Sequence, residues 1–173
     1  MLWLVIVAVV VVGVGFVAFT GAPYVPSKRR DVQRALSELY DLGDKDLLVD
    51  IGSGDGIVLR EASKRGARAV GYEIHPVLVL ISRWLSRDDD RVAVRQANFW
   101  RTDLPSETTV VYTFGDGRDI DKMGAYVQRQ ATKLDREIAF ISYAFETKQK
   151  PASKVGAHFL YIYKPLHTDN EPL

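Results

Sequence analysis

The sequence predicts one α/β domain with a mostly parallel sheet, preceded by a single membrane-spanning helix. From residue 28 onward, short apolar runs alternate with segments of helical periodicity, which is typical of strands joined by crossover helices. The first apolar run leads directly into a glycine-rich turn, and an uncharged segment of membrane length begins the chain. We expect about six strands, with the last one antiparallel to its neighbour.

Residues 2–20 (LWLVIVAVVVVGVGFVAFT) carry no charge. A helix of this length rises about 28 Å, close to the hydrocarbon thickness of a bilayer. A secretory signal peptide would need a basic start and a small-residue cleavage site, and a buried strand would be much shorter. No basic residue precedes Leu2, whereas Lys28, Arg29 and Arg30 follow. We therefore predict that residues 1–21 form a single-pass anchor and that the rest of the chain lies on the cytoplasmic side.

Residues 22–46 begin with APYVPS and continue into a predicted helix from Lys28 to about Leu42. Two prolines keep the residues before them extended, and Ser27 is a candidate N-cap for the helix. The apolar positions of this helix recur at helical spacing, so they share one face. Taken alone, PYVPS is equally well explained as a stiff linker between a membrane and a domain.

The chain is organised around residues 47–56, LLVDIGSGDG. A short apolar strand ends at Asp50 and runs into a turn with Gly52, Gly54 and Gly56. Glycine is required where φ is positive or where a Cβ atom would collide with a bound group. The predicted helix that follows points its first N–H groups toward the same place. The turn is therefore a candidate ligand site, against the alternative of a tight turn without a ligand.

The acids around this turn indicate which ligand it holds. A nicotinamide or flavin site would show G-x-G-x-x-G and would bind a pyrophosphate, whereas this turn has G-x-G-x-G with Asp50 just before it. The next strand, residues 68–72, ends at Glu73, where an acid accepts both ribose hydroxyls of a nucleoside. S-adenosyl-L-methionine, a nucleoside with an ammonium group and no phosphates, suits both acids. An NAD-linked oxidoreductase remains a distant alternative.

Pro76 suits the first turn of a helix after Glu73. Its apolar residues form a wide stripe that predicts mostly core positions, and these are Val77, Leu80, Ile81, Trp84 and Leu85. A third strand is expected at residues 92–96, and a nearly continuous apolar run at 108–114 predicts a central parallel strand.

A helix beginning near Asp119 should follow the central strand, and then a fifth strand at 138–145. The linker from there to the last strand, 158–164, is polar and has no helical period, whereas a parallel crossover needs a helix. The last two strands should therefore form an antiparallel hairpin.

Composition excludes several classes of protein. All charged side chains lie beyond residue 27, and 23 basic residues nearly balance 22 acidic ones, so we expect no nucleic-acid partner. The absence of cysteine excludes disulfides and thiolate metal sites. The histidines, His75, His158 and His167, are too scattered in sequence to suggest a zinc site, and we expect no metal.

VDIGSGDG and GYEIHP together resemble motif I and the following acid of the seven-β-strand methyltransferases. APYVPS, between an apolar segment and a helix, resembles a family of membrane-associated protein-lysine methyltransferases. That family includes the enzymes that methylate the mitochondrial adenine nucleotide translocase and the c-ring protein of ATP synthase, and it has soluble archaeal relatives. The resemblance covers roughly residues 22–115. It implies a Rossmann-like class I methyltransferase sheet in residues 47–173, shortened to about six strands, with the PYVPS segment folding over the cofactor.

The resemblance also implies site residues. Ile74 should lie on the adenine, and Asn98 occupies a position where an acid often bonds the adenine amino group, which its side-chain oxygen can also do. The catalytic candidates are Tyr24, Phe114 and Asp116, and no general base stands out. The predicted cofactor-binding residues are Tyr24, Pro26, Ser27, Asp50, Gly52, Ser53, Gly54, Asp55, Gly56, Glu73, Ile74, Asn98 and Phe99.

These features together predict a membrane-anchored, S-adenosylmethionine-dependent methyltransferase whose substrate is a lysine of a membrane or membrane-proximal protein. An apolar pocket would favour the neutral lysine amine, and aromatic side chains at its mouth would suit the lysine stem. Two alternatives stay open: methylation of a lipid or small hydrophobic acceptor, and a protein that binds the cofactor without turnover.

Overall fold

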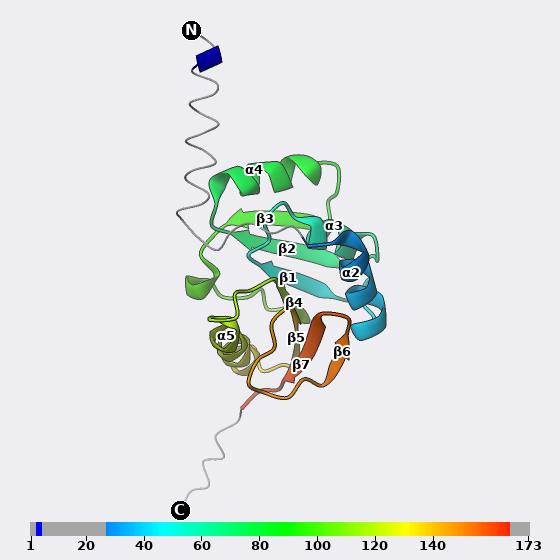
Figure 1. Ribbon diagram of the computed structural model, residues 1–173, viewed down its shortest axis with the longest axis vertical. Coiled ribbons are helices and arrows are strands. Elements are labelled where there is room, and N and C mark those ends of the chain that lie inside the picture. Colours follow the sequence, from blue (N-terminus) through cyan, green and yellow to red (C-terminus); the bar gives the residue numbers. More distant parts are fainter. Residues whose placement is uncertain (1–2, 5–26, 167–173) are drawn as a thin grey trace, which may run out of the picture.

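The computed structural model describes residues 3–4 and 27–166 (Figure 1). Apart from Trp3 and Leu4, the predicted anchor at residues 1–21 lies outside this part of the chain, as do Tyr24 and Pro26. Within the described residues, no helix combines the length and the apolar character needed to cross a membrane.

Seven strands form one sheet in the order β3-β2-β1-β4-β5-β7-β6. The first five strands pair in parallel, and β7 lies antiparallel between β5 and β6. The mostly parallel sheet with an antiparallel C-terminal strand is therefore confirmed. The strands are β1 (Leu47–Ile51), β2 (Arg68–Glu73), β3 (Val92–Gln96), β4 (Val110–Thr113), β5 (Ile138–Tyr143), β6 (Ser153–Val155) and β7 (His158–Tyr163).

The prediction of about six strands was wrong because it missed β6. This strand is only three residues long and pairs with β7 alone, from Ser153 opposite Leu160 to Val155 opposite His158. Ser153 and Lys154 are exposed at the edge of the sheet. A short, polar edge strand carries no apolar alternation, so the sequence pattern could not reveal it.

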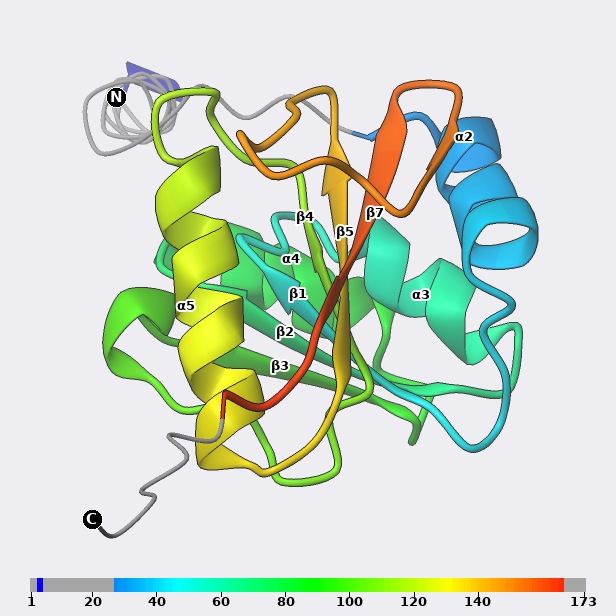
Figure 2. The ribbon, with the colours of Figure 1, turned by 90° about the horizontal axis from the view of Figure 1, so that it is seen from below.

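Helices cover both faces of the sheet (Figures 1 and 2). Figure 2 shows α5 on one side and the pair α2 and α3 on the other. Residues of α2, α3 and α4 share one buried cluster, while those of α5 belong to a second. The helices are α2 (Arg29–Arg34), which continues as the π-helix η1 (Ala35–Leu39), α3 (Ile57–Ser63), α4 (Pro76–Leu85), the 3₁₀ turn η2 (Phe99–Arg101) and α5 (Ile120–Lys133).

The central strand β1 is buried along its whole length, as expected for a parallel strand covered on both faces. Its register with β2 and β4 brings the carboxyl ends of the three strands to one edge of the sheet. In open α/β sheets, ligands bind beyond this edge. The glycine turn after β1 begins there.

The helix predicted at residues 28–42 begins at Arg29, with Lys28 as N-cap and no side-chain cap. The expected capping by Ser27 was therefore wrong. Ser27 is buried, and a hydrogen bond links its side chain to Tyr112 in β4. The start of the helix is fixed instead by Arg29, whose Nε atom donates to Glu61 Oε1 of α3 at 2.8 Å.

The apolar stripe of α4 lies outward, which contradicts the prediction that it is mostly core. Val77, Leu80, Ile81, Trp84 and Leu85 are all exposed, whereas Val79 and Ser82 are the buried residues of the helix. Helical period shows which residues share a face, but it cannot show which face points toward the sheet. Within the described residues, no element covers the outer side of α4.

Candidate functional site

A cavity of about 690 Å³ opens at the carboxyl ends of β1, β2 and β4. This is the place where the sequence predicted the cofactor. It brings together many of the predicted site residues, which are Ser27, Asp50, Gly52, Ser53, Gly54, Asp55, Glu73, Ile74, Phe99, Phe114 and Asp116.

The glycine turn is held by the acid at the end of β2. The backbone N–H of Gly54 donates to Glu73 Oε2 at 2.9 Å, and that of His75 donates to Glu73 Oε1 at 2.8 Å. Gly54 has φ of 53°, and Gly52 has φ of 84°. A Cβ atom on Gly52 would meet nothing within 4 Å, so this glycine faces open space at the cavity. The carboxylate of Glu73 thus fixes the turn while one side of it lines the cavity.

Gly71 of β2 allows the turn to approach the sheet. A Cβ atom there would lie 2.5 Å from Ser53 Oγ and 2.7 Å from Leu59 Cδ1, which is closer than real Cβ contacts allow. Ser53 Oγ is buried and has no hydrogen-bond partner among the described residues. The turn therefore packs directly onto the backbone of β2.

The charge of the cavity favours a cationic ligand. Asp50 is buried, and its pKa lies well above the usual range because of burial first and then because of the charges of Glu73 and Asp55. Asp116 and Asp119 also line the cavity, and Arg118 is the one lysine or arginine side chain among the described lining residues. A positive group near Asp50 would relieve this repulsion, whereas a pyrophosphate would add to it. The residues present therefore suit an ammonium-bearing nucleoside such as S-adenosyl-L-methionine better than a dinucleotide.

Two predicted residues, Gly56 and Asn98, do not line the cavity. Gly56 is the N-cap of α3 with φ of 78°, and a Cβ atom there would collide with Ser82 Oγ of α4, so this glycine allows two helices to pack closely. Asn98 uses its side-chain oxygen to accept from the N–H of Trp100 at 3.1 Å, which caps η2. Tyr24 and Pro26 lie outside the described residues.

The opposite end of the cavity is formed where β4 and β5 finish, and it is largely apolar. Sequence reasoning had named Phe114 here but had missed Tyr112, Ala144 and Phe145. Tyr112 could not be recognised because its partner, Nε2 of His158 at 2.8 Å, comes from β7. Ala144 has φ of 70°, a conformation that turns the chain back sharply after β5 and could not be inferred from its residue type.

Asp116 is a poor candidate for a general base. Arg118 Nη2 binds Asp116 Oδ2 at 2.6 Å, and Arg118 Nε contacts both carboxylate oxygens. These bonds lower the pKa of Asp116 below its usual range. A carboxylate of lowered pKa has little tendency to take up a proton.

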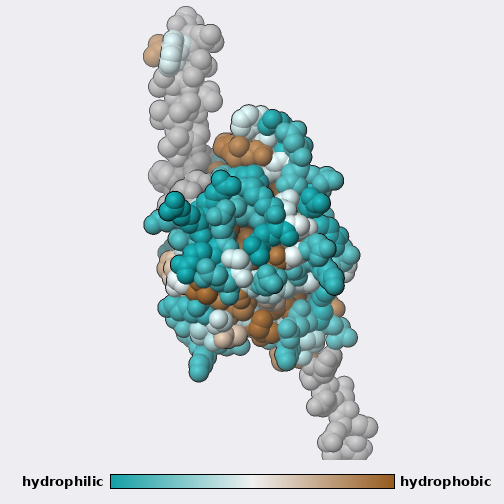
Figure 3. Space-filling model, turned by 90° about the vertical axis from the view of Figure 1, so that its right-hand side faces the viewer, coloured by the Kyte–Doolittle hydropathy of each residue, from teal (hydrophilic) through white to brown (hydrophobic). Residues whose placement is uncertain are grey.

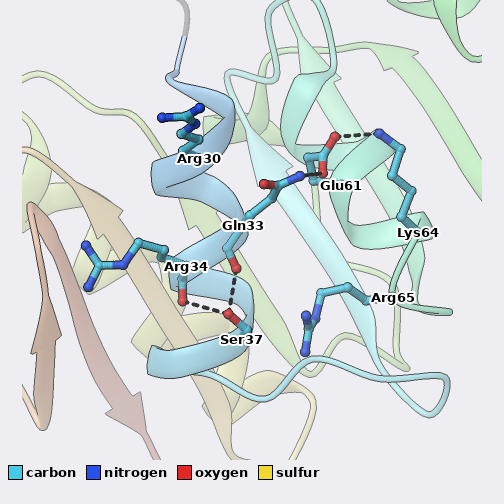
Figure 4. Close-up of a pocket in the computed structure, with 7 residues that line it drawn as sticks. All are labelled: Arg30, Gln33, Arg34, Ser37, Glu61, Lys64 and Arg65. Atoms are coloured by element: carbon cyan, nitrogen blue, oxygen red, sulfur yellow. Dashed lines mark hydrogen bonds and ion pairs between the residues drawn. The ribbon is translucent and has the colours of Figure 1, made fainter.

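A second cavity, of about 480 Å³, lies between α2 and α3 (Figure 4). Its centre is the buried Glu61, which accepts from Arg29, Gln33 and Lys64. Arg34 points away from this carboxylate, so the cations do not converge on one point. This cavity is an ion-paired seam between two helices. In the described part of the chain, no three histidine, aspartate or glutamate residues are grouped closely enough to hold a metal ion.

The ANTKMT methyltransferase domain family matches residues 50–154 of this chain. The chain is 32% identical over 120 residues to the lysine N-methyltransferase of the ATP synthase c-ring protein from Xenopus laevis, a match that covers 68% of this chain and 52% of that protein. It is 33% identical over 97 residues to a protein-lysine N-methyltransferase of Saccharolobus islandicus, covering 53% of this chain and 59% of that protein. The chain spans about half the length of the curated relatives it matches.

A solved structure described as an RNA methyltransferase from Salinibacter ruber in complex with S-adenosyl-L-homocysteine is also similar. It has a TM-score of 0.72 and 30% sequence identity, and the match covers 85% of this chain and 98% of that chain. S-adenosyl-L-homocysteine is what S-adenosyl-L-methionine becomes when it loses its methyl group. The family match and this neighbour confirm S-adenosyl-L-methionine as the cofactor that Asp50 and Glu73 had indicated.

Proposed function

The chain belongs to the ANTKMT methyltransferase domain family, and on that premise we propose that it methylates a lysine side chain of a membrane or membrane-proximal protein. Three relatives support the choice of lysine, because their names describe lysine N-methyltransferases of the ATP synthase c-ring protein, of adenine nucleotide translocase and of protein in general. We also propose that the cofactor contacts the predicted residues that line the 690 Å³ cavity.

The observation that carries this proposal is the polarity of the cavity, which is acidic at one end and apolar at the other. Asp50, Asp55 and Glu73 gather around the glycine turn, while Phe114 and Phe145 line the part below the ends of β4 and β5. A nucleoside with a positive charge suits the first end. A long aliphatic side chain that must reach a methyl group suits the second.

When bound, S-adenosyl-L-methionine supplies an activated methyl group, which passes to the lysine nitrogen as the carbon–sulfur bond breaks and its electron pair returns to sulfur. The residues of this chain hold the lysine amine in line with that bond, so positioning is their main contribution. Apolar side chains such as Phe114, whose ring centre lies 4.7 Å from that of Tyr143, favour the neutral amine. The proton of the lysine leaves to water.

We further propose that residues 1–21 anchor the chain in a membrane, with the catalytic domain on the cytoplasmic side. The support is the uncharged segment 2–20 and the basic residues that follow it from Lys28. Alkaline extraction of membranes tests the anchor, since an integral protein remains with the lipid and a peripheral one is released.

RNA methylation is the second candidate. The solved neighbour described as an RNA methyltransferase aligns with this chain over 98% of its own length. Two features oppose it: the acidic cavity would repel a phosphate backbone, and the basic residues in Figure 4 do not converge.

The test uses the full chain in mild detergent with tritiated S-adenosyl-L-methionine and membranes that lack this protein. Protein, lipid and RNA fractions are separated, and the protein fraction is hydrolysed. Radioactive methyl-lysine is the expected result. Label in RNA or lipid would contradict the lysine proposal, and cofactor binding without transfer to any fraction would favour a protein that binds without turnover.

A further inference from the structure

The helix α4 is turned inside out relative to an ordinary surface helix. Its exposed residues are all large and apolar at the positions that share its outer face, with exposed fractions of 65% for Leu80, 65% for Trp84 and 41% for Ile81. Figure 3 shows apolar surface at the upper end of the domain, where α4 lies in Figure 1. Isolated apolar residues on a surface are ordinary, but a contiguous stripe marks an interaction site.

The inner face of α4 is unusually polar. Ser82 and Ser86 are buried there, and their hydroxyl oxygens have no hydrogen-bond partner within the described part of the chain. Arg83 ties the same side to the sheet, donating from Nε and Nη2 to the carbonyl oxygen of Val94 at 3.0 and 2.9 Å. A helix held by its polar side leaves its apolar side for another phase.

From this geometry we propose that the outer face of α4 inserts into the surface of a lipid bilayer. We define this face as Val77, Leu80, Ile81, Trp84 and Leu85. Residues 2–20 are uncharged, and only six residues separate position 20 from the first residue of the described domain, so the tether is at most about 25 Å long. The described domain is thus held close to the same phase that would cover segment 2–20.

The bilayer explains the apolar surfaces better than the other possible covers. Segment 2–20 is apolar on all sides, so packing it against α4 would leave most of it in water, whereas lipid covers both surfaces at once. Trp84 also has the arrangement of an interfacial residue, because the guanidinium carbon of Arg87 lies 5.3 Å from the centre of its ring.

Charge contributes little to this docking. Arg83, Arg87 and Arg91 on and after α4 are opposed by the run Asp88 to Asp90, and Arg87 pairs with Asp88 at 3.3 Å. Arg95 of β3 and Arg101 of η2 are also exposed nearby in the chain. Binding should therefore depend on apolar insertion and should vary little with the content of anionic lipid.

The α4 face continues toward the cavity. Ile74, just before α4, and Trp100, in η2, are 59% and 39% exposed and both line the cavity. A bilayer against α4 would therefore place the mouth of the cavity at the membrane surface. This last step rests on the proposed function, because it says where the acceptor lysine is presented, namely at the lipid boundary.

The absence of cysteine allows a direct test in the full chain. Leu80→Cys on the α4 face and Ala125→Cys, an exposed position on α5, are each labelled with an environment-sensitive fluorophore. The chains are reconstituted into phosphatidylcholine vesicles at one copy per vesicle, with and without lipid that carries a quencher. We expect severalfold quenching at position 80, none at 125, and less than a twofold change when a fifth of the lipid is anionic.

Three results would overturn the proposal. A label at position 80 that remains exposed to water would show that lipid does not cover α4. Protection without quenching at one copy per vesicle would indicate the chain's own apolar segment, and protection that depends on protein concentration would indicate a second copy. Because no methyl transfer is measured, the result is independent of whether the lysine acceptor is right.

Discussion

The Nε2 atom of His158 lies 2.8 Å from the hydroxyl oxygen of Tyr112, and both side chains are buried. The ring of Tyr143 stacks on the imidazole at 4.4 Å with an angle of 12° between the planes. Burial lowers the pKa of His158 to about 4, opposed in part by the charge of Asp31. A neutral histidine from β7 thus supports a tyrosine that lines the cavity, and it joins the antiparallel end of the sheet to the site.

This pair predicts a loss of stability in acid. Between about pH 6.5 and 4, the unfolded chain binds a proton on His158 that the folded chain excludes. The contribution is therefore complete above pH 6.5 and falls as pH is lowered, by up to about 1.4 kcal/mol per pH unit. Urea unfolding in detergent from pH 7.5 to 4.5 measures it. His158→Gln should show a shallower dependence, and parallel curves for the two proteins would contradict the assignment.

Asp50 predicts an exchange between stability and binding. Its raised pKa means that the folded chain without cofactor holds a proton that the unfolded chain has lost, so this residue destabilises the fold as pH rises above the usual aspartate range. We expect Asp50→Asn to raise the melting temperature of the protein without cofactor at pH 7.5, measured by thermal unfolding. A lower melting temperature would contradict the role of burial.

The same residue predicts proton release on binding. If a positive group of the cofactor approaches Asp50, it favours the charged carboxylate, so a protonated Asp50 should release its proton. Calorimetric titration with S-adenosyl-L-methionine in buffers of different ionisation enthalpy measures that release. In Asp50→Asn we expect the release to disappear and the affinity to fall about tenfold to a hundredfold, for a lost charge-assisted contact of about 1.5 to 3 kcal/mol.

Glu73 and Glu61 form a matched pair of buried acids, each of which accepts hydrogen bonds from nearby donors. Glu73 lines the cavity, whereas Glu61 joins α2 to α3. Glu73→Ala should weaken cofactor binding by about 1.5 to 3 kcal/mol, since it removes the proposed ribose contact and the support of the glycine turn. Glu61→Ala should lower stability and leave the dissociation constant unchanged. Equal losses of affinity in both variants would show that binding reports only general destabilisation.

The central part of the fold could be predicted because its signals are local. An apolar run followed by an acid and closely spaced glycines fixed β1, its turn and the positions of Asp50 and Glu73 at one edge of the sheet. The pairing of Tyr112 with His158 is not local, because it depends on β7 lying beside β5. No pattern within either strand contains that information.

The direction of α4 could not be predicted for a different reason. Two stripes run along this helix, one of large apolar residues and one around Ser82 and Ser86, and periodicity alone allows either to face the sheet. The close approach at Gly56, where a Cβ atom would collide with Ser82, selects the serine side. Gly56 was therefore predicted for its neighbourhood to the ligand, while the structure uses it to pack two helices.

Gly52 offers the sharpest separation of binding from folding. It has φ of 84° and faces open space at the cavity, while Gly156, in the turn between β6 and β7, has φ of 59° and also has nothing within 4 Å of a built Cβ atom. Alanine at either position should cost about 1 to 2 kcal/mol of stability, because an L-residue disfavours positive φ. At Gly52 the added methyl group also enters the cavity, so Gly52→Ala should weaken cofactor binding at least tenfold. Gly156→Ala should bind normally in the same titration, and if Gly52→Ala does so as well, the cofactor does not approach the turn as proposed.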